Sequence, residues 1–143
     1  MHIPRKNRPA ASVVVLSGNW GSPVEVDHFE LTSNKDDLPT LLHELGSGLR
    51  SHLSGLAADR VVIRRADVQV ASRKEGPRLR LLAEGAMAGA ARSEVRDVIL
   101  LPGKDLAAKS PATSKDDLDT QAAGRVPNSP VEAAAAALVG LSL

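Results

Sequence analysis

The apolar residues near the N-terminus follow the two-residue rhythm of β-strands. Ser12 to Ser17 (SVVVLS) is a short run rich in β-branched side chains, and Val24 to Thr32 alternates between apolar and polar positions. Turn residues fill the segment GNWGSP between them. The pattern predicts two strands that pair as an antiparallel hairpin.

A stripe of leucines at helical spacing follows the hairpin. Ser33 or Asn34 is placed to cap a helix, and Asp36 and Asp37 fall in its first turn, where the helix dipole favours negative charge. The stripe consists of Leu38, Leu41, Leu42, Leu45, Leu49, Leu53 and Leu56. This spacing predicts an amphipathic helix that buries its leucine face.

The stretch DRVVIRRAD, residues 59–67, reads as a strand that ends in two adjacent arginines, Arg64 and Arg65. Its apolar run is charged at both flanks, as expected for a strand buried on both faces. Residues 72–95 then predict a second helix with Pro77 near its start. Its second half is rich in small residues, which predicts close packing against a sheet; these residues are Gly85, Ala86, Ala88, Gly89, Ala90 and Ala91.

The remaining segments predict a third buried strand and three helices. The strand candidate is Val95 to Pro102, followed by a short helix at GKDLAAK. A helix is predicted from Lys115 to Ala123, and a last one begins at Ser129, with Ser129 as cap and Pro130 in the first turn.

This order of elements predicts an α/β fold. Strands that alternate with helices in the second half imply parallel crossovers, and the hairpin adds an antiparallel part. We therefore expect one mixed central sheet with helices on both faces. Residues 1–10 form a basic, proline-punctuated arm that we expect to be flexible, and residues 11–143 form a single domain.

Composition narrows the function. Apolar residues make up 43% of the chain, but there is one Phe, one Trp and no Tyr, so few rings are available to stack on bases. The net charge is +1, and the absence of cysteine excludes disulfides, thiol nucleophiles and cysteine metal sites. The histidines are dispersed and lack metal-ligand spacing. No run is long enough for a membrane span and no signal peptide is evident, so we expect a cytoplasmic protein without membrane contact.

The organisation from about Ser12 to Leu141 resembles the RNase H-like fold, and within it the RuvC-type Holliday-junction resolvases. SVVVLSGN stands where those proteins have a strand ending in Asp, and DRVVIRR where they have a strand ending in Glu. LLAEGAMAGAAR is similar to their small-residue helix, and NSPVEAAAAALVG to their final helix. The resemblance implies an RNase H-like sheet and a site at which carboxylates bind two divalent metals, typically Mg²⁺.

The acids that this resemblance requires are mostly missing. Ser17 stands at the first position, Arg64 or Arg65 at the second, and Glu132 and Ala135 at the last two, so Glu132 alone keeps a carboxylate. The resemblance therefore implies a degenerate site without a metal. We expect the strand-end arginine to replace the charge of the metal and to pair with Glu132. The alternative is that both arginines extend into solvent.

A group of basic residues surrounds this strand. It could contact phosphates or an acidic surface of a protein partner, or it could be a solvated face. Its members are Arg60, Arg64, Arg65, Arg73, Lys74, Arg78 and Arg80.

Three functions remain open on the sequence. The first is a non-catalytic RNase H-like binding subunit or adaptor in a larger, nucleic-acid-processing assembly, with a protein partner or a second copy of the chain. The second is an active Mg²⁺-dependent nuclease or resolvase with its acids at shifted positions such as Asp27, Asp67 or Glu84. The third is a nucleic-acid-binding module that uses the basic residues without cleavage.

Overall fold

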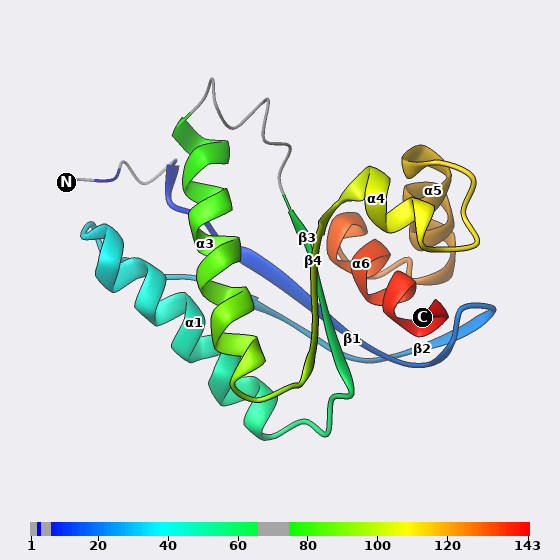
Figure 1. The fold of residues 1–143 in the computed structure, drawn as a ribbon, viewed down its shortest axis with the longest axis horizontal. Coiled ribbons are helices and arrows are strands. Elements are labelled where there is room, and N and C mark those ends of the chain that lie inside the picture. The colour runs from blue at the N-terminus through cyan, green and yellow to red at the C-terminus, as the bar shows by residue number, and fades with distance from the viewer. Residues whose placement is uncertain (1–2, 4–6, 66–74) are drawn as a thin grey trace.

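The fold combines two pairs of strands with helices packed around them (Figure 1). A computed structural model describes residue 3, residues 7–65 and residues 75–143. The described elements are, in order, β1 (Ala11–Asn19), β2 (Ser22–Leu31), α1 (Leu38–Ser54), β3 (Arg60–Arg65), α3 (Glu75–Arg92), β4 (Asp97–Pro102), α4 (Gly103–Ala108), α5 (Lys115–Arg125) and α6 (Val131–Ser142).

Strands β3 and β4 form a parallel pair that separates two hydrophobic cores. Val61 and Ile63 of β3 face the first core, whereas Val62 faces the second, as the alternation of side chains along a strand requires. Helices α1 and α3 lie on one side of this pair and α4, α5 and α6 on the other (Figure 1). The expectations of a parallel crossover and of helices on both faces are confirmed.

The two cores draw on different parts of the chain. Buried residues of the first are Ile3, Leu31, Leu41, Leu45, Leu49, Leu53, Leu79, Ala83, Met87, Ala91 and Val95. Those of the second are Val14, Leu106, Ala107, Leu118, Ala122, Val126, Ala134, Ala135, Ala136, Leu138 and Val139. Alanine, valine and leucine side chains therefore fill the second core.

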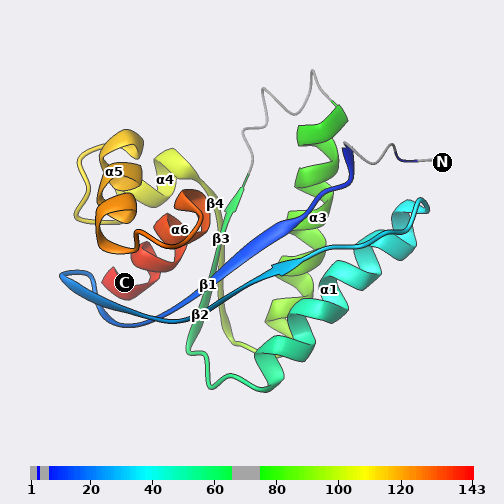
Figure 2. The same cartoon turned by 180° about the vertical axis from the view of Figure 1, so that it is seen from behind.

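Strands β1 and β2 form the predicted antiparallel hairpin, but the hairpin does not join the parallel pair. In the described residues the strands make two separate two-stranded sheets, so the expectation of one mixed sheet is wrong. Helix α6 packs against both β1 and β3, so the hairpin and the parallel pair are connected through this helix and not through a strand ladder. The hairpin crosses behind β3 and β4 in Figure 1 and in front of them in Figure 2, which is the view from the opposite side.

The hairpin turn depends on a glycine with an unusual backbone. Gly18 has a φ of +94°, and a Cβ there would lie 2.6 Å from the carbonyl oxygen of Ser22. Any other residue would be strained at this position. Within the turn, Arg125 of α5 lies over the ring of Trp20 at 5.6 Å and donates to its backbone carbonyl, so the hairpin tip is fixed to a helix of the second core.

The start of α1 differs from the sequence prediction. Asp37 is the cap, and its carboxylate accepts hydrogen bonds from the backbone and hydroxyl of Thr40, whose side-chain and backbone bonds lower the pKa of Asp37. Ser33 instead bonds Glu44. A helix that began at Ser33 or Asn34 would place Pro39 beyond its first turn, where the missing N–H breaks a helical hydrogen bond.

The last two helices were predicted with different success. The helix predicted from Lys115 to Ala123 is present as α5, and Ser114 caps it by accepting a hydrogen bond from the backbone of Asp117. Ser129 does not cap α6; its hydroxyl donates to Glu25 of β2, and Pro130 precedes the helix. This bond to Ser129, followed by the one with His28, lowers the pKa of Glu25.

The N-terminal arm lies partly outside the described residues. Ile3 is fully buried in the first core, and Arg8 pairs with Asp36 ahead of α1. Among the described residues, none of the helices combines the length and the apolar character that crossing a bilayer requires.

Small residues of α3 allow close packing against helix α1. A Cβ on Gly46 of α1 would lie 3.3 Å from the Cβ of Ala90 in α3, so the two helices approach closely there. Gly85 and Gly89 are exposed, with no atom within 4 Å of an added Cβ. The expectation that all the small residues pack tightly is therefore wrong for these two glycines.

A matched pair of substitutions in α3 tests this contact. Ala90→Leu should lower the free energy of unfolding by about 1–3 kcal/mol, because the new side chain must enter the space beside Gly46. Gly89→Leu should leave it unchanged or raise it by up to about 1 kcal/mol, because leucine favours the helix and meets nothing. Denaturant unfolding of both variants gives the comparison. Equal losses in the two variants would show that α1 and α3 do not meet at Gly46.

Candidate functional site

A cavity of about 1000 Å³ lies between β1, β3 and α6, with parts of α1 and α3 on its other side. Three of the residues matched by the resemblance line it, each from a different element: Ser17 from β1, Arg64 from β3 and Glu132 from α6. Arg80 and Glu84 of α3 line it as well. The fold therefore gathers these positions around one space.

Two of the predicted positions lie elsewhere. Ala135 is fully buried in the second core, and the α6 residues that line the cavity near Glu132 are Ala133, Ala136 and Ala137. Arg65 is half-buried, does not line the cavity, and has a buried Nε with no hydrogen-bond partner.

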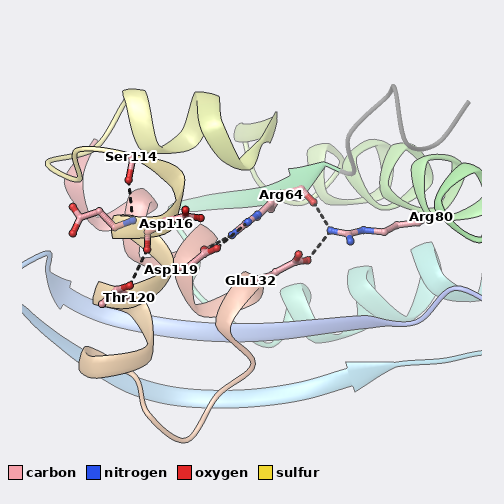
Figure 3. Close-up of polar contacts among 8 residues, drawn as sticks. Arg64, Arg80, Ser114, Asp116, Asp119, Thr120 and Glu132 are labelled. Carbon is pink, nitrogen blue, oxygen red and sulfur yellow. Dashed lines mark hydrogen bonds and ion pairs between the residues drawn. The ribbon is translucent and has the colours of Figure 1, made fainter.

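Arg64 makes a buried ion pair with Asp119 of α5. Its side chain is 6% exposed, and its two terminal nitrogens donate to the two carboxylate oxygens of Asp119 at 2.6 and 3.3 Å (Figure 3). Gly103, the first residue of α4, makes room for the guanidinium: a Cβ there would lie 2.7–2.9 Å from three of its atoms. The strand-end arginine therefore joins β3, α4 and α5.

Arg80 connects two acids beside this pair. Its Nε donates to Glu84 at 2.5 Å. Its terminal nitrogen donates to Glu132 at 2.8 Å and to the backbone carbonyl of Arg64 at 3.4 Å (Figure 3). Burial acts to lower the pKa of Arg80, but the hydrogen bonds and charges of Glu84 and Glu132 outweigh it and raise the pKa. Arg80 thus holds a stable positive charge between β3, α3 and α6.

The prediction that Arg64 pairs with Glu132 is wrong. Arg64 binds Asp119, and Glu132 is bound by Arg80. The cause is the position of Asp119, which follows the buried Leu118 on α5 and faces the end of β3. One signal for this network is visible in the sequence, the spacing of Arg80 and Glu84 one helical turn apart.

The basic group does not form one continuous exposed surface in the described residues. Arg60 lies at the start of β3, where it pairs with Asp97 at 2.5 Å and donates to the carbonyls of Gly140 and Leu143. Arg64 is buried at the other end of the strand, and Arg78 is exposed on α3. Two members, Arg73 and Lys74, fall in the gap at 66–74.

The acids of the nuclease alternative are dispersed. Asp27 lies on the exposed part of β2, Glu84 is bound by Arg80, and Asp67 falls outside the described ranges. Within residue 3, residues 7–65 and residues 75–143, no three His, Cys, Asp or Glu side chains gather in an arrangement that would hold a metal ion.

No family model matches the sequence, and no curated protein matches it either.

Proposed function

We propose that this chain is a non-catalytic protein related to the RNase H-like, RuvC-type nucleases, and that it acts as a binding subunit or adaptor in a larger assembly. The placement of Ser17, Arg64 and Glu132 around one cavity supports it, because the resemblance predicts that these positions come together. Helices on both faces of a parallel pair of strands are compatible with the same relationship.

One observation carries the proposal: the guanidinium of Arg80 bridges Glu84 and Glu132 at the cavity. A divalent cation would need these carboxylates as oxygen ligands. Arg80 occupies both of them, and its own charge would repel the cation. The arginine therefore supplies the positive charge that a metal supplies in an active nuclease of this type.

The ion pairs also favour a protein partner over nucleic acid. A phosphate-binding surface needs arginines and lysines whose charge is available to the phosphates. Arg60, Arg64 and Arg80 are each committed to a carboxylate of the same chain. Their charge is largely compensated before any ligand arrives.

The first test is a cleavage assay with the purified full chain. We expect no cleavage of a four-way DNA junction or an RNA–DNA hybrid with Mg²⁺ or Mn²⁺, because Arg80 holds Glu84 and Glu132, two of the three acids that line the cavity. The double variant Glu84→Gln/Glu132→Gln, purified in the same way, is the control for a contaminating nuclease. Metal-dependent cleavage by the wild type that disappears in this double variant would overturn the proposal in favour of an active nuclease.

A further inference from the structure

The cavity lies along the free edges of two strands. β1 pairs only with β2 and β3 only with β4 among the described strands. Residues 11–18 of β1 and residues 60–64 of β3 line the cavity without a gap, whereas β2 contributes Val26 alone and β4 contributes nothing. The face of a strand would contribute every second residue, so a continuous run indicates that the cavity meets the strands at their edges.

A free strand edge presents backbone groups at a fixed spacing. Each strand offers N–H donors and C=O acceptors that are unsatisfied by the pairing partner on its other side. The ligand that matches a row of such groups is another extended polypeptide backbone, as in recognition by strand addition. Two edges that open onto one space make this match more specific than one edge on an open surface.

The side walls suit the side chains of an inserted strand. Leu53 of α1 and Met87 of α3 lie on one side, and Ala133 and Ala137 of α6 on the other. Side chains of an extended segment alternate between its two faces. Side chains on one face of the inserted segment would therefore contact the apolar wall of the first core, and those on its other face would contact the apolar wall of the second core.

The charge of the lining indicates an uncharged ligand. The formal charges of its lining residues cancel: Arg60, Arg64 and Arg80 against Asp59, Glu84 and Glu132. The arginines are also paired individually with carboxylates. A nucleic-acid strand would bring one negative charge per phosphate into this neutral space, whereas an apolar peptide segment brings none.

We infer that the cavity binds an extended, uncharged and mainly apolar segment of a partner protein, which inserts as a strand along the free edges of β1 and β3. The segment would be about as long as β3, which has six residues. This inference rests on the proposed binding function and names the chemistry of its partner.

A displayed library of random peptides, selected on the full chain, provides the probe. The recovered peptides are expected to be uncharged, with β-branched or other apolar residues at alternate positions. Hydrogen exchange of the complex with a synthetic recovered peptide should show new protection at every second amide along residues 11–18 and 60–65, because alternate N–H groups face the free edge.

Two substitutions separate the cavity from the rest of the surface. Ala137→Phe fills the cavity and should weaken peptide binding about tenfold or more. Ala123→Phe places the same side chain on the exposed side of α5 and should leave binding unchanged. Unfolding midpoints of both variants confirm that they fold, and if Ala137→Phe does not, Ala133→Phe takes its place.

The inference is overturned if no peptide is recovered, if the recovered peptides are charged, or if protection appears away from β1 and β3. Tight, salt-dependent binding of a single-stranded oligonucleotide to the same cavity would also overturn it. The peptide experiments and the cleavage assay test different statements. Failure of strand insertion would not contradict the non-catalytic function, and detection of cleavage would not by itself contradict peptide binding.

Discussion

Replacing Asp119 with alanine is expected to lower the free energy of unfolding by about 2–4 kcal/mol. The substitution leaves the guanidinium of Arg64 buried, with its side chain 6% exposed, and without the carboxylate that it binds through two hydrogen bonds. A buried charge that loses its partner is much more costly than an exposed one. Urea unfolding of wild type and variant measures the difference.

Asp116→Ala is the matched control for this variant. Asp116 is an exposed acid in the first turn of the same helix, and its removal should cost no more than about 0.5 kcal/mol. The double variant Arg64→Met/Asp119→Leu should recover much of the loss, because it removes both charges together. If Asp119→Ala is no less stable than Asp116→Ala, the ion pair does not hold β3 to α5.

Replacing Arg80 with alanine should have two effects that occur together. Stability should fall by about 1–3 kcal/mol, because the buried Glu84 loses a charged partner and Glu132 loses its link to α3. The variant should then be stabilised by Mn²⁺, whereas the wild type should not. A ligand present at about 100 times its Kd adds about 2.7 kcal/mol, enough to restore much of the loss.

The response to Mn²⁺ shows whether Arg80 takes the place of a metal ion or only stabilises the fold through its ion pairs. The variant Arg80→Ala/Glu132→Gln keeps the cavity but lacks one carboxylate, so Mn²⁺ should stabilise it less than it stabilises the single variant. Thermal melts of wild type, single and double variants with and without Mn²⁺ give the comparison. An equal metal response in all of them would mean that Arg80 is only a structural ion pair.

Local signals in the sequence predicted most of the elements. The helix predicted from Lys115 to Ala123 matches α5, and the charged flanks of a short apolar run predicted that β3 is covered on both faces. These features depend on residues within a few positions of one another. The start of α1 was predicted wrongly because the position of Pro39 was not considered. Proline is tolerated only in the first turn of a helix, so the helix starts after Asp37 and not after Ser33 or Asn34.

The contacts between distant segments could not be predicted in the same way. Arg64 was expected to bind the one acid that the resemblance retained, but Asp119, 55 residues away along the chain, occupies its guanidinium. The separation of the hairpin from β3 depends on how α6 packs, which no pattern within β1 or β3 encodes. Of the positions that the resemblance named, Ser17, Arg64 and Glu132 line one cavity, whereas Arg65 and Ala135 do not, and the partner of Arg64 was not predicted.

The placement of α6 has a consequence for the order of folding. Helix α6, which packs against both β1 and β3, consists of residues 131–142. It is therefore synthesised after both of these strands. Until then β1 and β3 carry exposed edges without the helix that shields the space between them, which is the condition that favours wrong pairing and aggregation. The long sequence separation of these contacts also slows folding. Nascent chains stalled before residue 131 should therefore depend on chaperones more than released ones do.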